Sequence, residues 1–254
     1  MTKVVIVSGG NAGLGLEISQ RLLELGNIVV AFGLAEHRPE SFTAFAEDRI
    51  NFMTADLTEE FQINALCKQV AEHFGRIDAI VNNAAYGPLG TLSNTSVEMW
   101  QKIQNVNLLG PFILSKAAVP YMNAETGGSI VNIGSGAGWG KANMLAYATS
   151  KGGLMAFNQA LALDLFQYKI RVNALIPGGG GIVTLMSLER FNGSQAALQE
   201  KAVGSVAGRP IHGGDMADAV NFLISDAAQT ISGTVIDVGC FHHQGSSTPL
   251  GIAK

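Results

Sequence analysis

Strand-length apolar runs alternate with helix-length segments along the whole chain. The predicted strands cover residues 3–8, 27–32, 50–55, 77–81, 127–133, 170–176 and 234–238, and helical patterns run up to residue 25 and over 59–74, 96–122, 145–166 and 215–225. Continuous apolar runs are typical of strands that are buried on both faces of a parallel sheet. With no linker or repeat in 254 residues, the alternation predicts one α/β domain over residues 1–254. We expect a doubly wound parallel sheet of about seven strands, with helices on both faces.

A glycine-rich turn joins the first predicted strand to the first helix. Its sequence, over residues 9–15, is Gly-Gly-Asn-Ala-Gly-Leu-Gly. Glycine lets a backbone come close to a ligand, and a helix start offers unpaired N–H groups and partial positive charge. The turn therefore predicts a phosphate site, although a tight turn without a ligand fits the same residues.

The second and third predicted strands end in residues that bear on the choice of a nucleotide. Dinucleotide-binding folds often place an acid near the end of the second strand to hold the ribose 2′-hydroxyl. Gly33 stands at that place here, and His37 and Arg38 follow. A 2′-phosphate would not be repelled there, and Arg38 or His37 could pair with it unless both are simply solvated, so the residues lean to NADP and leave NAD open. Asp56, at the end of the third strand, either borders the adenine or caps the next helix.

Tyr147 and Lys151 are four residues apart in a predicted helix, so they share one helix face. A phenol has a pKa near 10 and is a poor base at neutral pH. A cation about 4 Å away, at an effective dielectric constant near 20, is worth roughly 4 kcal/mol. Lys151 is therefore a sufficient cause for making Tyr147 a proton donor and acceptor, if the two side chains converge. The alternative is an ordinary half-buried tyrosine beside a solvated lysine.

Other polar residues follow strands or interrupt a helix. Asn83 and Ser135 come at the ends of strands, where such folds bind ligands. The amide of Asn83 can instead tie neighbouring strands together. Asn107 lies in a long helix that Pro111 and Pro120 should bend, and its amide needs either a bridging water or a neighbouring carbonyl. Glycines at 178–181 precede a stretch over about 182–210 that we interpret as a lid. A partly apolar pocket is expected from Tyr86, Trp139, Met144, Met186 and Phe191.

Charged residues make up only 14% of the chain, and the net charge is −4. No basic tract or membrane-length apolar run occurs, so we expect neither a nucleic-acid nor a membrane partner. The first predicted strand begins at residue 3 and leaves no room for a signal peptide, which indicates a cytoplasmic protein. Cys67 and Cys240 read as reduced thiols, and His242 and His243 as surface or interface residues, so no metal site is expected.

Taken together, these motifs resemble the short-chain dehydrogenase/reductase family over about residues 3–245. The residues that carry the resemblance are Ser-Gly-Gly-Asn-Ala-Gly-Leu-Gly at 8–15, Asn-Asn-Ala-Ala at 82–85, Asn107, Ser135, Tyr147 with Ser150 and Lys151, and Pro177, Gly178 and Thr184. The resemblance implies a Rossmann-type fold and an NAD(P)-dependent oxidoreductase that acts on alcohols or carbonyl compounds. It also implies a homo-oligomer, often a tetramer.

The resemblance further implies a role for each matching residue. The catalytic residues would be Asn107, which holds a relay water, Ser135, which orients the substrate oxygen, Tyr147, the general acid and base, and Lys151. The residues around the cofactor would be Gly9, Asn11, Gly13, Leu14, Gly15, Gly33, Arg38, Asp56, Leu57, Asn83, Ala84, Tyr147, Lys151, Pro177, Gly178, Ile182 and Thr184. A non-redox lyase on the same fold and a non-catalytic dinucleotide sensor are the alternatives. The sequence identifies neither the substrate nor the direction of the reaction.

Overall fold

The computed structural model describes residues 2–122, 125–178, 182–200 and 205–239. Its strands are β1 (Val4–Ser8), β2 (Ile28–Gly33), β3 (Ile50–Thr54), β4 (Ala79–Asn82), β5 (Gly128–Ile133), β6 (Ile170–Pro177) and β7 (Val235–Val238). Its helices are α1 (Gly13–Glu24), α2 (Glu60–Phe74), α3 (Val97–Gln104), α4 (Gly110–Ala118), α5 (Leu145–Asp164), α6 (Leu185–Glu189), α7 (Gln195–Glu200) and α8 (Gly213–Ile224). The seven predicted strands are confirmed, most of them within a residue at each end.

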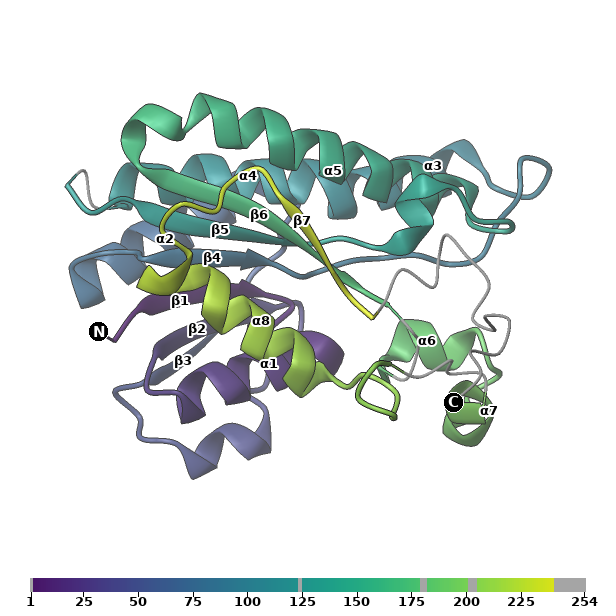
Figure 1. The fold of residues 1–254 in the computed structure, drawn as a ribbon, viewed down its shortest axis with the longest axis horizontal. Coiled ribbons are helices and arrows are strands. Elements are labelled where there is room, and N and C mark those ends of the chain that lie inside the picture. Colours follow the sequence, from purple (N-terminus) through teal and green to yellow (C-terminus); the bar gives the residue numbers. More distant parts are fainter. Residues whose placement is uncertain (1, 123–124, 179–181, 201–204, 240–254) are drawn as a thin grey trace, which may run out of the picture.

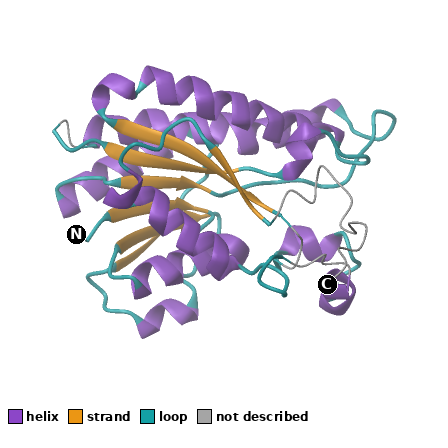
Figure 2. Cartoon of the chain, in the orientation of Figure 1, coloured by secondary structure: helices purple, strands orange, loops and turns teal. Residues whose placement is uncertain are grey.

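All seven strands are parallel and lie in the order β3-β2-β1-β4-β5-β6-β7. Helices cover both faces, with α1 and α8 on one side and α4 and α5 on the other (Figure 1). Figure 2 shows the same layers, with the strands enclosed between helices. The predicted doubly wound α/β fold is therefore confirmed. The chain reverses its winding between β1 and β4, and such a reversal leaves a crevice at the carboxyl ends of the strands.

Each central strand sends alternate side chains into two separate cores. Val4 and Ile6 pack against one face of the sheet together with residues of α2, α4 and α5. Val5 and Val7 pack against the other face with residues of α1 and α8. This two-sided burial explains why the strands read as unbroken apolar runs rather than alternating ones.

The predicted helix over residues 96–122 is divided at its prolines. After α3, the turn widens to a π-type segment at Asn105–Leu109, and α4 follows with Pro111 in its first turn. Proline has no N–H to donate to the carbonyl four residues earlier, which favours such a break. Pro120 lies in a short 3-10 turn at Val119–Tyr121. Both prolines thus interrupt the regular helix, as predicted.

Several expectations concern cysteines, metals and membranes. Cys67 is a buried free thiol whose pKa is raised to about 12 by burial. Cys240, His242 and His243 lie outside the described residues. Within the described ranges, no three His, Cys, Asp or Glu side chains gather closely enough to hold a metal ion. The described helices include none that is both long and apolar enough to cross a membrane.

Candidate active site

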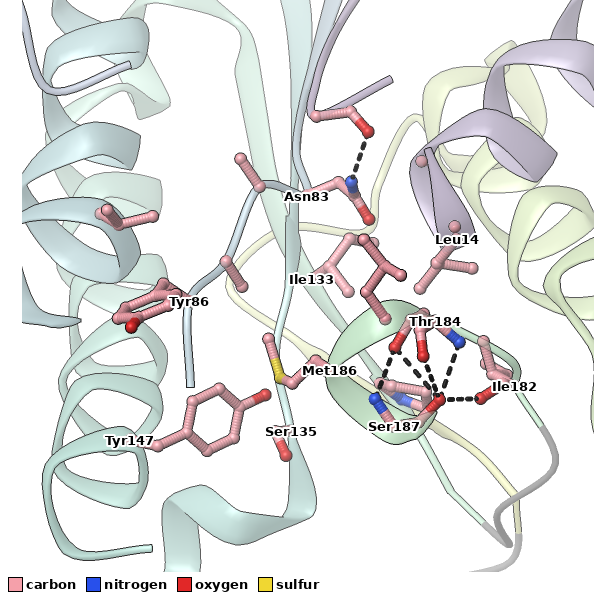
Figure 3. A pocket seen from close by; sticks show the side chains of 18 of the residues that line it. Leu14, Asn83, Tyr86, Ile133, Ser135, Tyr147, Ile182, Thr184, Met186 and Ser187 are labelled. Atoms are coloured by element: carbon pink, nitrogen blue, oxygen red, sulfur yellow. Dashed lines mark hydrogen bonds between the residues drawn. The ribbon is translucent and has the colours of Figure 1, made fainter. Parts of the chain in front are cut away.

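A cavity of about 1270 Å³ opens at the carboxyl ends of the strands. The glycine turn after β1, the ends of β2, β4, β5 and β6, and the segment around α6 all contribute to its wall. Small-molecule pockets commonly hold roughly 300–1,000 Å³, so this one has room for a ligand larger than a typical small molecule. Figure 3 shows Tyr147 and Ser135 on one side of the cavity and Leu14 and Thr184 on the other.

The cavity brings together most of the residues singled out from the sequence. Those that line it are Gly9, Asn11, Gly13, Leu14, Gly15, Gly33, Asp56, Leu57, Asn83, Ala84, Ser135, Tyr147, Lys151, Pro177, Gly178, Ile182 and Thr184. Tyr86, Met144, Met186 and Phe191 line it too, whereas Trp139, Arg38 and Asn107 do not. The rest of the predicted glycine run, residues 179–181, lies outside the described residues.

The glycine turn has the shape that a close ligand requires. Gly9 and Gly13 have φ angles of +62° and +49°, which side chains rarely adopt. A Cβ at Gly15 would come within 2.8 Å of the Gly9 carbonyl carbon and nearer still to its oxygen. The N-cap of α1, Ala12, makes no side-chain cap, so the first N–H groups of the helix have no side-chain acceptor at the cap. The turn therefore fits a phosphate group, and a side chain at position 15 would push the Gly9 backbone out of place.

Asn83 fixes the end of β4 to the end of β1. Its Nδ2 donates to the Ser8 carbonyl oxygen at 3.0 Å, as Figure 3 shows. The Ser8 hydroxyl in turn accepts the backbone N–H groups of Asn83 at 3.0 Å and Ala84 at 3.1 Å. The structural interpretation of Asn83, as a tie between neighbouring strands, is thus confirmed, and the same residue also faces the cavity.

The residues after β2 are arranged differently from the expectation. Arg38 forms an ion pair with Glu47 and donates to the Phe42 carbonyl oxygen, so its guanidinium is engaged away from the cavity. The idea that Arg38 holds a 2′-phosphate therefore loses its support. Gly33 lies against Asn11, because a Cβ there would stand 3.1 Å from Asn11 Cγ and closer to Oδ1. Asn11 thus covers the place where dinucleotide-binding folds often carry an acid.

Asp56 closes the turn before α2 but does not cap that helix, whose N-cap is Glu59. Its Oδ1 accepts the Thr58 backbone N–H at 2.8 Å and the Thr58 hydroxyl at 2.7 Å, which closes the turn before α2. Asp56 and Leu57 also line the cavity. Leu57 packs against Gly110 at the start of α4, because a Cβ on Gly110 would be 2.7 Å from the Leu57 side chain.

Tyr147 lies near the start of α5 and is only 8% exposed. Burial raises the pKa of its phenol, while the Ser135 hydroxyl and the Arg190 guanidinium act to lower it. Figure 3 shows the hydroxyl of Tyr147 turned into the cavity, towards Ser135. The ring itself packs against Gly87, where a Cβ would come within 2.8 Å of Cε2. Position and orientation of the phenol are thus set by its neighbours.

Lys151 is buried one helical turn further along α5, and it contacts a backbone group rather than the phenol. Its Nζ donates to the Ile133 carbonyl oxygen at 2.7 Å and stands 5.9 Å from the centre of the Tyr147 ring. Burial lowers the pKa of Lys151 to about 8. The groups that act to lower the pKa of the Tyr147 phenol are the Ser135 hydroxyl and the Arg190 guanidinium, and Lys151 is not among them.

Asn107 is fully buried in the π-type segment, and its amide is used locally. Its Oδ1 accepts the Tyr86 N–H at 2.7 Å, and its Nδ2 donates to the Tyr86 carbonyl oxygen at 2.8 Å and to the Ser150 hydroxyl at 3.0 Å. Of the two interpretations given to this residue, the bonds match the neighbouring carbonyl. Asn107 thus ties the loop after β4 to α5 at Ser150, the residue before Lys151.

The segment that we interpret as a lid contacts the glycine turn through Thr184. Thr184 caps α6, with its hydroxyl accepting the Ser187 N–H at 3.0 Å while the Ser187 hydroxyl accepts the Thr184 N–H at 2.7 Å. The side chain of Thr184 lies on Gly13, where a Cβ would be 3.2 Å from its Cγ2. Helices α6 and α7 fill much of the expected range 182–210, and residues 201–204 lie outside the described part.

The wall and contact residues that were not anticipated from the sequence include Gly87, Lys102, Lys141 and Arg190. None of these four belongs to a motif. The available signal was Arg190, the first basic residue after residue 182.

The fold and the cavity define a Rossmann-type protein with a dinucleotide-sized site at its strand ends. The sequence profile of the short chain dehydrogenases matches residues 3–193. The chain therefore belongs to the short-chain dehydrogenase/reductase family. Members of this family are oxidoreductases that use NAD or NADP.

Three relatives illustrate the similarity. A 2-(R)-hydroxypropyl-CoM dehydrogenase of Xanthobacter autotrophicus is 33% identical over 93% of this chain and 96% of its own length. A 3-oxoacyl-[acyl-carrier-protein] reductase of Haemophilus influenzae is 32% identical over 93% and 96%. The solved structure of a Thermoplasma acidophilum aldohexose dehydrogenase, in ligand-free form, superposes with a TM-score of 0.81 at 31% identity, covering 93% of this chain and 92% of that one.

Proposed function

We propose that this chain transfers a hydride between the nicotinamide of NAD or NADP and the carbon of a carbonyl or secondary alcohol substrate. Tyr147 is the general acid and base. The observation that supports this most is a single cavity that holds both the glycine turn and the Tyr147 side chain. A phenol in that position gives a proton to the substrate oxygen during reduction and takes one during oxidation. The cofactor, when bound, supplies the hydride chemistry.

The neighbouring residues have supporting roles in the proposal. Ser135 donates a hydrogen bond to the substrate oxygen from the same wall as Tyr147. The ammonium of Lys151, fixed by Ile133, stabilises the phenolate that forms when Tyr147 has given up its proton, and it holds the nicotinamide ribose. Asn107 positions the Tyr86 peptide and Ser150 around Lys151 and holds a water for proton relay, as the family resemblance implies.

The residues at the glycine turn fit a dinucleotide. We propose Gly9, Asn11, Gly13, Leu14 and Gly15 for the pyrophosphate, and the other cavity residues predicted from the sequence for the rest of the cofactor. Because Arg38 is paired with Glu47, the lean to NADP now rests on Gly33 alone, where no acid would repel a 2′-phosphate. Isothermal titration with NADH and NADPH in parallel decides between them.

The lid and the assembly belong to the same proposal. The segment from residue 182 to about 210 acts as a lid over the bound ligands. We also propose a cytoplasmic homo-oligomer, a tetramer by family resemblance. Leu163 and Phe166, at the end of α5, are 79% and 77% exposed, and such apolar side chains favour a contact between subunits.

Two other functions compete with hydride transfer. A non-redox lyase on this fold would have no use for a dinucleotide, and a non-catalytic sensor would have no use for Tyr147 or Lys151. The relatives described above are named for a coenzyme M derivative, an acyl-carrier-protein thioester and a sugar. Their names therefore do not select a substrate for this chain.

The test is a cofactor titration followed by a turnover screen. We expect the fluorescence of NADH or NADPH to change on binding, and the reduced cofactor to be consumed with some of a panel of ketones. Binding without turnover across ketones and secondary alcohols would favour the sensor. Turnover of a substrate without any cofactor would favour the lyase.

A further inference from the structure

Arg190 places a cation in the substrate half of the cavity. It follows α6 directly, lines the cavity, and its guanidinium carbon is 5.4 Å from the centre of the Tyr147 ring. One nitrogen, Nη2, donates to the Gly87 carbonyl oxygen at 3.3 Å. The Nε atom is buried and has no hydrogen-bond partner among the described residues. A guanidinium has five N–H donors; one bonds Gly87 and another bonds the Tyr147 side chain, so the remaining donors are available to a ligand.

Among the described residues, no carboxylate neutralises this cation. Arg190 takes part in none of the ion pairs formed within the described ranges. Among the described residues that line the cavity, Lys102, Lys141, Lys151 and Arg190 are basic and Asp56 is the one acid. Asp56 follows β3, at the nucleotide end, and it is occupied by Thr58. The substrate end is therefore positively charged and has no acid of its own.

The two exposed lysines extend the same charge to the entrance. Lys102 stands 4.7 Å above the Tyr86 ring, and both Lys102 and Lys141 are exposed. A cleft lined by one sign of charge concentrates ligands of the opposite sign. This is notable in a chain whose net charge is −4, because the positive charge is local to the cavity.

We propose that Arg190 binds a carboxylate of the substrate, so that the substrate is an oxo acid or hydroxy acid whose carboxylate lies a few bonds from the reacting carbon. This inference rests on the proposed hydride transfer and adds the class of substrate. Since the guanidinium lies beside the Tyr147 ring, one small molecule reaches both groups with its carbonyl oxygen at Tyr147 and its carboxylate at Arg190. The planar guanidinium matches a carboxylate with two parallel hydrogen bonds.

A second role for Arg190 has to be separated from this one. The same guanidinium lowers the pKa of Tyr147, and a residue that only tunes the phenol would affect every substrate equally. A residue that binds the substrate carboxylate affects acids alone, and chiefly through KM. The two roles therefore predict different results for neutral substrates.

The experiment compares each of several oxo acids with its methyl ester: pyruvate, acetoacetate, levulinate and 5-oxohexanoate. We expect kcat/KM of the wild-type protein for the best acid to exceed that for its ester by about tenfold to a hundredfold. Arg190→Gln should remove this preference by raising KM for the acid, with a much smaller loss of kcat/KM for the ester, and Arg190→Lys should restore part of it. Lys68→Gln is the control, because it removes the same charge from the exposed face of α2, away from the cavity.

A binding measurement makes the test independent of turnover. Pentanoate, an unreactive acid, should bind to the protein that is saturated with reduced cofactor, whereas pentanamide should not. Arg190→Gln should weaken pentanoate binding about tenfold or more. If pentanoate binds in this way but the protein reduces none of the ketones, the carboxylate site is supported and hydride transfer is refuted. Equal use of acids and esters by the wild-type protein overturns the inference. An equal loss of kcat/KM for acid and ester in Arg190→Gln, together with a shifted pH–rate profile, also overturns the inference. Arg190 would then act on the pKa of the Tyr147 phenol and not on the substrate carboxylate.

Discussion

Gly87 packs directly against the face of Tyr147, and Gly87→Ala tests how strictly the phenol is positioned. A Cβ at residue 87 would stand 2.8 Å from Cε2 of the ring and 3.1 Å from Cγ, and closer still to Cδ2. The φ angle of Gly87 is not positive, so alanine suits the backbone there. The substitution therefore perturbs the ring and little else.

The size of the effect follows from these distances. Carbon atoms in contact are about 3.5–4.0 Å apart, so the Tyr147 ring has to move by about 1 Å. It is 8% exposed and packs on Ala137 and Met144, so the movement carries its hydroxyl away from the substrate position. A misplacement of about 1 Å costs roughly a hundredfold in rate, which equals about 2.7 kcal/mol. We expect kcat to fall about a hundredfold with cofactor affinity unchanged.

Steady-state kinetics and a cofactor titration measure the two quantities separately. Gly214→Ala is the matched control, because its Cβ would meet only the exposed His212 side chain, at 3.0 Å. A double variant, Gly87→Ala with Tyr147→Phe, should be no slower than Tyr147→Phe alone, since the hydroxyl is already gone. Wild-type turnover by Gly87→Ala, or additive losses in the double variant, would refute the reasoning.

Three further substitutions test other parts of the structure. Gly15→Ala should weaken cofactor binding at least about tenfold in a fluorescence titration, because its Cβ collides with the Gly9 carbonyl group; unchanged affinity would argue against the glycine turn as the pyrophosphate site. Burial lowers the pKa of Lys151 from 10.5 to about 8, so between those values the unfolded chain binds more protons and the stability of the wild-type protein should rise with pH. Lys151→Met should lack that rise in the free energy of unfolding, measured with urea as a function of pH. The same pH dependence in the variant and the wild-type protein would contradict the reasoning. Asn132→Ala should cost about 2–4 kcal/mol of unfolding free energy, because Asn132 bonds both Asn82 at 2.8 Å and Asn158 at 3.0 Å in the core; a loss below about 1 kcal/mol would show that these amides find other partners.

Much of the fold was predictable because its determinants are local in the sequence. A strand buried on both faces is a continuous apolar run, and every such run became a strand. The cavity wall was predictable for the same reason, since the carboxyl ends of parallel strands meet and bring Gly9, Asn83 and Ser135 together. The break in the helix at Pro111 also follows from one residue.

What the sequence did not predict depends on contacts between distant segments. Arg38 turned away from the cavity because Glu47 offers it a carboxylate. Lys151 points to the Ile133 carbonyl group because β5 ends beside α5. Gly87 and Arg190 reach Tyr147 from two separate loops. Loop placement and ion pairing are decided by the folded structure, and no local pattern encodes them.

The central claim is that the hydroxyl of Tyr147 moves the proton while hydride is transferred in the same cavity. Its most direct test is a single-turnover measurement on Tyr147→Phe, saturated with cofactor and with a ketone that the wild-type protein reduces. The account predicts cofactor binding as tight as in the wild-type protein and a reduction rate at least about a hundredfold lower. A rate equal to that of the wild-type protein would contradict it.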